Sequence, residues 1–510
     1  MSKETDTNFL QRYDKTIIVL LFICGFAISL IQFLSDRSLW LDEAYLSHSI
    51  IHRDAFRLLK PLGLMQVAPI LFLQFEKLFS TLLPNSDYGL RIFPLLSYWL
   101  SIVFFFKIVK LIFNKNYLII FGLSLFVLNP TLIYYSSEVK QYMSDVLVLI
   151  IIYYVILKNY KHTKEKYIIF IIAGVFGVFL SNVAPIILLS AGVYLFYTSY
   201  TNNYSEIKYL IITFIIWGVS FCVYYFLFIH NHPTKDFMVI YWYKAGAFLP
   251  GNPFTADFYI FLWIKSQMII YKLFKFKHFG GVLIGVLLIA GVAKIIVQKK
   301  SNLIVLLLLP LITHLFLSSL NIYPFDKRLI LYLTPLFIIL ILLGFQTVSD
   351  IVKLNLKQNI VKLSVLFIPL TIFALSKKKM FPYKVEEIKE SINYINENIV
   401  SGDSLLLYYA AKPAFRYYQK IKYELPKSNP HELGSWTKNI IPEDIEYLDN
   451  LKSNYWILFS HPRKNESEYI LNAIDSMGHK KVKEFITVGS SAYLFKPDNL
   501  NDTILQHIKY

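Results

Sequence analysis

Cysteine and charge are both scarce in this sequence. Its 510 residues include two cysteines, Cys24 and Cys222, and both lie inside apolar runs. So few cysteines exclude a disulfide framework and a cysteine-rich metal site. Charged residues make up 17% of the chain and apolar residues 55%. Soluble domains carry about 25% charged residues, so this composition argues against an ordinary soluble protein.

The apolar residues gather in long uncharged runs. Residues Thr16 to Leu34 include no charged side chain, and at about 1.5 Å per residue such a run crosses a hydrocarbon core of about 30 Å. The runs are continuous rather than alternating, which favours membrane helices over a β-barrel. The first run lacks a small-residue cleavage site and is predicted to stay as an anchor. We predict eleven spans, near 16–34, 90–112, 117–135, 142–158, 166–180, 183–199, 207–229, 280–297, 302–320, 328–347 and 360–377.

Lysines in the short loops predict the orientation. They cluster at 107–115, 158–166, 299–300 and 353–357. Cytoplasmic loops are enriched in lysine and arginine, so we expect Asp42 and the chain after Lys377 to lie outside. The same pattern accounts for the net charge of +17 without a nucleic-acid partner. Segments 66–83 and 257–273 mix charges with apolar residues, and we predict amphipathic helices in the outer interface there.

Beyond Lys377 the composition becomes that of a soluble domain. We predict a transmembrane catalytic domain over 1–377, with its first outer loop at 35–89, and a small extracytoplasmic α/β domain over 378–510. The expected elements of this second domain are helices at 386–399 and 410–420, strands at 405–409 and 455–459, and a strand pair at 485–487 and 492–495. The domain contains no glycine-rich phosphate loop.

The first outer loop places two acids beside an aromatic residue, in Trp40-Leu41-Asp42-Glu43. Acids favour helix N-termini, so both could cap the helix that follows. One carboxylate could instead take a proton from an acceptor hydroxyl or amine while the other orients it. The residues by themselves leave both interpretations open.

Two further polar clusters fall on the same predicted face of the membrane. They comprise Glu138, Lys140, Gln141 and Tyr142 between the third and fourth spans, and Tyr323, Lys327 and Arg328 before the tenth. Short loops need polar residues to turn, and cations beside a helix end can extend to lipid headgroups. Arg328 could equally hold a lipid phosphate through a bidentate contact.

In this order, the clusters resemble those of bacterial members of glycosyltransferase family 39, from the superfamily that includes protein O-mannosyltransferases and the aminoarabinose transferases of lipid A. The matching motifs are Trp40-Leu41-Asp42-Glu43, Leu90-Arg91-Ile-Phe-Pro94, Tyr135-Ser-Ser-Glu138-Val-Lys140-Gln141-Tyr142 and Tyr323-Pro-Phe-Asp-Lys327-Arg328. The resemblance extends over residues 16–347. It implies a GT-C fold and inverting transfer of a sugar from a polyprenyl-phosphate donor.

The resemblance also implies roles for single residues. Asp42 is similar to the family's catalytic base and Glu43 to its neighbour in the acceptor site. The residues similar to the donor-binding set are Glu138, Lys140, Gln141, Tyr142, Lys327 and Arg328, with Arg91 and Tyr323 as further candidates. Gln66 stands where many relatives have a histidine, so that metal ligand is absent. A divalent cation on Asp42 and Glu138 stays open, since hard cations favour oxygen ligands.

The function hypothesis is a glycosyltransferase of the bacterial cytoplasmic membrane, with its active site on the outer face. Its partners would be the lipid bilayer, a polyprenyl-phosphate sugar and an unidentified acceptor, either a protein, a glycolipid or a cell-envelope glycan. A transporter or flippase of lipid-linked sugars is the first alternative, but it should carry ionisable residues at the bilayer midplane and repeated halves, which this sequence lacks. A non-catalytic envelope assembly protein is the second alternative.

Overall fold

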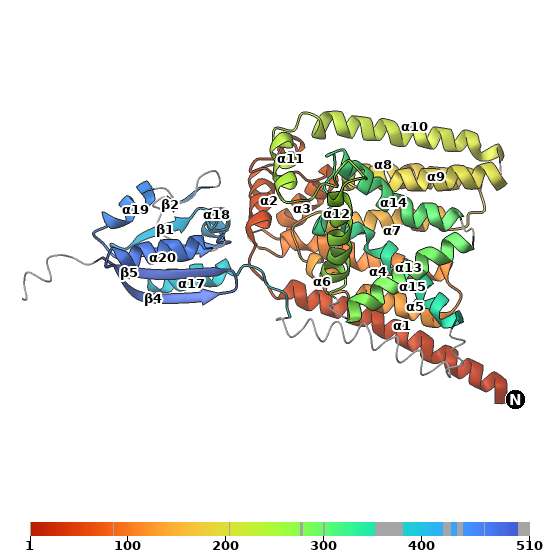
Figure 1. Cartoon of the computed structure of the whole chain (residues 1–510), viewed down its shortest axis with the longest axis horizontal. Coiled ribbons are helices and arrows are strands. Elements are labelled where there is room, and N and C mark those ends of the chain that lie inside the picture. The colour runs from red at the N-terminus through yellow and green to blue at the C-terminus, as the bar shows by residue number, and fades with distance from the viewer. Residues whose placement is uncertain are drawn as a thin grey trace, which may run out of the picture. The chain divides into compact units, whose positions relative to one another are not determined.

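The structure is a computed structural model that describes residues 2–84, 86–202, 204–275, 279–298, 301–351, 381–421, 430–435, 442–463 and 465–497. The chain forms two compact units (Figure 1). The first, here called the helical unit, comprises Met1–Leu34, Arg53–Thr81 and Leu90–Phe381. The second, the sheet unit, comprises Ser35–His52, Leu82–Gly89 and Pro382–Tyr510. Two parts of the first outer loop therefore cluster with the C-terminal sheet rather than with the helices.

Long apolar helices make up most of the helical unit. Among the described residues, seven are long and apolar enough to cross a membrane: Asp14–Leu34, Gly89–Ile112, Ala184–Thr201, Ile207–Ile229, Gly280–Val297, Asn302–Ser319 and Lys327–Ile351. These seven agree with seven of the predicted spans, and the span predicted at 360–377 lies outside the described residues. They correspond to α1 (Ser2–Leu34), α4 (Ile92–Ile112), α9 (Ala184–Asn202), α10 (Ile207–Tyr224), α13 (Phe279–Val297), α14 (Ser301–Ser319) and α15 (Thr334–Ile351). The segments of α4, α10 and α15 each include an adjoining short helix, η2 (Gly89–Arg91), η4 (Tyr225–Ile229) or η6 (Lys327–Leu333).

Several of these helices expose apolar side chains on one face. Ile211, Ile215 and Val219 of α10 are all more than half exposed, and residues four apart share a helix face. In water such a stripe would be unfavourable, whereas lipid covers it without cost. The chain is therefore a multi-pass α-helical membrane protein, as predicted.

The span predicted at 117–135 is wrong as a single helix. The structure has α5 (Asn116–Val127) and α6 (Pro130–Tyr135) instead, separated at Asn129. Pro130 has no amide hydrogen to continue the first helix, and it suits the first turn of a new one. The Asn129 side chain caps that new helix by accepting hydrogen bonds from the Thr131 and Leu132 amides, at 2.9 and 3.1 Å.

Two further helices continue the bundle, and the first of them packs on α4. They are α7 (Tyr142–Leu157), which follows α6 after a tight turn, and α8 (Thr163–Leu180), which packs on α7 and α10. Figure 1 shows α7, α8, α9 and α10 side by side. Asp145 in the first turn of α7 is buried and accepts a 2.6 Å hydrogen bond from the Ser181 hydroxyl.

Close contact between α13 and α15 depends on two glycines. A Cβ on Gly344 would lie 1.9 Å from the Leu287 carbonyl oxygen, and one on Gly291 would lie 2.1 Å from that of Leu340. Small residues let membrane helices approach backbone to backbone, where packing replaces the hydrophobic driving force.

The remaining elements of the helical unit are short. Helices α3 (Ile70–Leu82) and α12 (Ala256–Met268) have 13 residues each, which is about 20 Å and too short for the hydrocarbon core. In Figure 1, α12 runs across the direction of α7 to α10. The interfacial placement of these two helices stays a prediction. The other short elements are α11 (Lys235–Lys244), η1 (Arg57–Leu59), η2 (Gly89–Arg91), η3 (Tyr204–Glu206), η4 (Tyr225–Ile229), η5 (Ile269–Leu273) and η6 (Lys327–Leu333).

The sheet unit contains a mixed five-stranded sheet of order β2-β1-β3-β5-β4. Strand β1 is parallel to β2 and β3, while β5 is antiparallel to β3 and β4. The strands are β1 (Ser404–Tyr408), β2 (His431–Leu433), β3 (Tyr455–Ser460), β4 (Lys480–Thr487) and β5 (Ser490–Lys496). The predicted strands at 405–409 and 455–459 agree with β1 and β3, and the predicted pair at 485–487 and 492–495 agrees with the β4–β5 hairpin.

Helices cover both faces of this sheet. The helices are α17 (Ile388–Asn398), α18 (Lys412–Ile421), α19 (Pro442–Asp449) and α20 (Glu466–Ser476), while α2 (Leu41–His52) packs on α18. Ile457 of β3 belongs to a core cluster with Ile470 and Ile474 of α20. Trp456, whose side chain points to the opposite face, packs on Tyr394 of α17 with ring centroids 5.9 Å apart. Every residue of β3 is buried, and its side chains pack alternately on the two helical layers.

Candidate functional site

The two acids of the first outer loop lie in the first turn of α2, which belongs to the sheet unit. Trp40 precedes the helix, and its carbonyl accepts the first helical hydrogen bond from the Ala44 amide at 2.9 Å. The Glu43 carboxylate reaches back to the Trp40 amide at 3.3 Å. This is the acidic half of a capping box, so Glu43 does cap the helix.

Glu43 is also one partner of a buried ion pair. Its two carboxylate oxygens accept hydrogen bonds from both terminal nitrogens of Arg37, at 2.6 and 3.0 Å. The Arg37 and Glu43 side chains are 1% and 0% exposed. The Asp42 side chain, next to them, is half-buried. Of the two acids, Asp42 is therefore the one that solvent or a substrate can reach.

A third acid, Glu386, binds the start of the same helix. One of its oxygens accepts a hydrogen bond from the Leu41 amide at 3.1 Å, and the other lies 2.5 Å from His461 Nδ1. Because a carboxylate only accepts hydrogen bonds, that nitrogen carries the proton. The bond to Glu386 raises the pKa of His461 above its ordinary value, and the Asp42 charge adds to the shift. The His461 ring lies 6.4 Å from that of Trp40.

The second polar cluster belongs to the helical unit, between α6 and α7. Lys140 is buried, and its ammonium donates a 2.5 Å hydrogen bond to the Gln66 side-chain oxygen. Glu138 and Gln141 are buried as well. The side-chain oxygen of Gln141 has no hydrogen-bond partner among the residues that the structure describes. An unpaired buried polar atom costs about 1–3 kcal/mol, so this oxygen suits a bound hydroxyl group.

The third cluster meets the second. The Arg328 guanidinium, at the start of η6, lies 5.6 Å from the ring centre of Tyr142 and 6.0 Å from that of Trp242. Cation–π contacts of this kind orient the guanidinium plane. A half-buried arginine and a buried lysine thus lie on one side of the helical unit, around the N-terminus of α7.

Other predicted site residues lie less centrally. Lys327 is exposed, and its amide donates to the Met268 sulfur at 3.3 Å. Tyr323 packs on His314, with ring centroids 5.1 Å apart. Both ring nitrogens of His314 are within hydrogen-bond distance of protein oxygens, at 3.0 and 3.1 Å. Arg91 is buried at the end of η2.

The described residues contain no group of three or more histidine, cysteine or acidic side chains that could hold a metal ion. Asp42 and Glu138, the two candidate ligands, belong to different units.

Four residues around these clusters escape prediction from sequence. Arg37 was missed although it lies only six positions before Glu43. Glu386 and His461 were missed because they lie far along the chain from the loop residues Leu41 and Trp40 that they contact. Trp242 was missed for the same reason. Gln66 does stand out in the sequence, yet only the fold shows it as the partner of Lys140.

The fold has solved counterparts. ArnT from Cupriavidus metallidurans in the apo state is 10% identical, with a TM-score of 0.52 over 93% of this chain and 97% of that one. The same protein bound to undecaprenyl phosphate is 12% identical, with a TM-score of 0.50 over the same shares of the two chains. This chain has the ArnT fold. No protein-family model and no curated protein sequence matches it. The ArnT-like GT-C architecture implied by the sequence motifs is thus confirmed as a fold.

Proposed function

We propose that this chain is a membrane glycosyltransferase that moves a sugar from a polyprenyl-phosphate donor to an acceptor on the outer face of the bacterial cytoplasmic membrane. The observation that carries the proposal is the ArnT-like fold over 93% of the chain, in which one counterpart holds undecaprenyl phosphate. Within the proposal, the sheet unit is extracytoplasmic and the transfer is inverting, as in family 39.

The helical unit would bind the donor. A lipid phosphate leaves as an anion, and neighbouring cations stabilise that charge as it develops. Lys140 and Arg328 supply two such cations, and the planar guanidinium can bind two phosphate oxygens at once. The unpartnered Gln141 oxygen can accept a hydrogen bond from a sugar hydroxyl. Glu138 and Tyr142 shape the same region, and Lys327 is the exposed cation nearest to lipid headgroups.

The acceptor would react at Asp42. The Asp42 carboxylate takes the proton from the acceptor hydroxyl or amine as the acceptor atom bonds to the anomeric carbon. The bond between that carbon and the phosphate oxygen breaks, and its electron pair leaves with the lipid phosphate. We assign Glu43 a supporting role instead of an acceptor contact, because Arg37 and the Trp40 amide occupy its carboxylate.

The experiment uses the full chain in nanodiscs with a panel of radiolabelled polyprenyl-phosphate sugars and membrane extracts as acceptor source. We expect wild type to move label from one donor and Asp42→Asn to lose at least a hundredfold in rate while remaining folded. Asp54→Asn, at an exposed acid, is the matched control and should act as wild type does. Near-normal transfer by Asp42→Asn would remove Asp42 from this role. Lipid movement without product would favour the transporter.

A further inference from the structure

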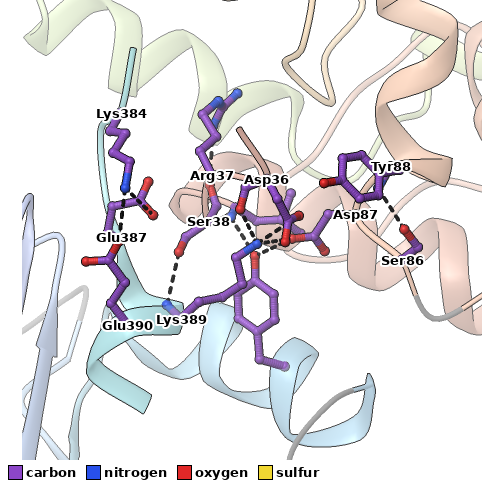
Figure 2. Close-up of polar contacts among 12 residues, drawn as sticks. Asp36, Arg37, Ser38, Ser86, Asp87, Tyr88, Lys384, Glu387, Lys389 and Glu390 are labelled. Atoms are coloured by element: carbon purple, nitrogen blue, oxygen red, sulfur yellow. Dashed lines mark hydrogen bonds and ion pairs between the residues drawn. The ribbon is translucent and has the colours of Figure 1, made fainter. Parts of the chain in front are cut away.

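One helix of the sheet unit binds the segment that leads to Asp42. Lys389, near the start of α17, donates its backbone amide to the Ser38 hydroxyl at 3.0 Å. Its ammonium binds the Asp36 carbonyl and lies 3.0 Å from the Asp36 carboxylate. It also lies 3.1 Å from the carboxylate of Asp87. Figure 2 shows these contacts converging on the one lysine.

A tyrosine of α18 binds the next residue of the segment. The Leu39 amide donates to the Tyr418 hydroxyl at 2.7 Å, and that hydroxyl donates to Asp87 at 2.9 Å. The neighbouring Tyr417 hydroxyl donates to the same Asp87 carboxylate at 2.8 Å. The Tyr418 hydroxyl thus bonds both the Leu39 amide and Asp87.

Glu386, just before α17, completes the set by accepting from the Leu41 amide. Residues 36, 38, 39 and 41 are thus each held by a side chain or amide of the C-terminal sequence, and Asp42 is the next residue along the chain. Asp36 has a φ of +44°, a conformation that costs a non-glycine residue free energy and persists where the surroundings impose it. Here the Lys389 ammonium contacts both the backbone carbonyl and the carboxylate of Asp36, and these contacts favour the positive φ.

We propose that Lys389, Tyr418 and Glu386 are positioning residues for Asp42, so that the C-terminal domain acts on the transfer reaction by holding residues 36–41. This inference rests on the proposed function, because it takes Asp42 as the base. It assigns the C-terminal domain a part in the chemical step, distinct from recognition of the acceptor. A base misplaced by about 1 Å loses on the order of a hundredfold in rate.

The first test compares two lysines at the same end of α17. Lys384 pairs with Glu387 and Glu390 at 3.5 and 2.9 Å, within the C-terminal sequence alone (Figure 2). We expect Lys389→Met to lower kcat at least tenfold with the KM for the donor within twofold, and Lys389→Arg to recover part of the loss. Lys384→Met should stay within twofold in both constants. Equal effects of the two methionine variants would overturn the proposal.

The second test removes one oxygen at a time. Tyr418→Phe deletes the acceptor of the Leu39 amide and one bond to Asp87, whereas Tyr417→Phe deletes the other tyrosine bond to the same Asp87 carboxylate. We expect kcat to fall several-fold more in Tyr418→Phe than in Tyr417→Phe. These variants keep the aromatic rings, so they carry the test should Lys389→Met fail to fold. A Tyr418→Phe protein with the kcat of Tyr417→Phe would contradict the inference.

Amide hydrogen exchange of residues 36–45 provides a readout that needs no turnover. We expect at least tenfold faster exchange in Lys389→Met and in Tyr418→Phe than in their controls. A wild type that turns over no donor would overturn the proposed function. The exchange difference would still support the inference that the C-terminal domain holds residues 36–41. If wild type transfers sugar but amide exchange of residues 36–45 is unchanged in both variants, the proposed function stands and the inference about the C-terminal domain is overturned.

Discussion

The buried pair of Arg37 and Glu43 allows a test of what the second acid of the loop does. Both side chains are almost completely buried, and two hydrogen bonds join them. We propose three variants of the full chain: Arg37→Met, Glu43→Met and the double variant. Methionine has a volume near that of either residue, so the double variant replaces two charges by apolar surface.

The magnitudes follow from the cost of an isolated buried charge. Removing one partner of a buried ion pair costs about 3–5 kcal/mol, whereas replacing both by apolar residues is often neutral. Each single variant should therefore be destabilised by about 3–5 kcal/mol. The double variant should lose about 1 kcal/mol, mainly the hydrogen bond from the Trp40 amide to Glu43. For a domain of this size, 1 kcal/mol shifts Tm by about 2–4 °C.

Thermal unfolding in nanodiscs, followed by tryptophan fluorescence, measures the effect. We expect Tm to fall by roughly 6–20 °C in each single variant and by only a few degrees in the double variant. The exposed pair Arg57–Asp54 is the control, and its disruption should leave Tm unchanged, because exposed pairs contribute little. Should Glu43→Met keep its Tm and lose transfer, the reasoning is refuted and Glu43 contacts the acceptor.

Three further results are expected. Lys140→Met should raise the KM for the donor roughly tenfold or more, because a hydrogen bond to a charged group contributes about 1.5–3 kcal/mol. An unchanged KM for the donor would exclude Lys140 from the phosphate site. Gly344→Ala should lower Tm and disturb the contact between α13 and α15, since its Cβ would meet the backbone of Leu287. Gly218→Ala has open space around the added Cβ and should have the Tm of wild type. Equal Tm values for the two variants would contradict this prediction. The raised pKa of His461 means that its ionised form stabilises the fold below about pH 6.5, and that this contribution disappears as pH rises through the folded-state pKa. Tm should therefore fall less between pH 6 and 8 in Glu386→Gln than in wild type, and parallel curves would count against the pairing.

Elements of the fold that depend on local composition could be predicted from the sequence. The span at 16–34 can be predicted because lipid selects for uncharged residues over its full length. Strand β3 can be predicted because both of its faces are covered, which gives a short continuous apolar run in the sequence. The break at Asn129 was missed because the apolar run continues through it. Asn129-Pro130 is a helix-start signal within that run, and the hydrogen bonds of the Asn129 side chain show that it begins a new helix.

For the polar clusters too, part can be predicted from local sequence and part depends on the tertiary structure. The sequence by itself determined which residues could carry charge to the membrane surface, since Asp42, Lys140 and Arg328 lie in short segments beside apolar runs. Only the tertiary structure decided how each is used. Glu43 pairs with Arg37, Lys140 with Gln66, and the segment before Asp42 with residues near 386–418. Such partners lie up to 379 positions apart in the chain. Burial makes each pairing obligatory, and burial is a property of the folded molecule and not of any local pattern.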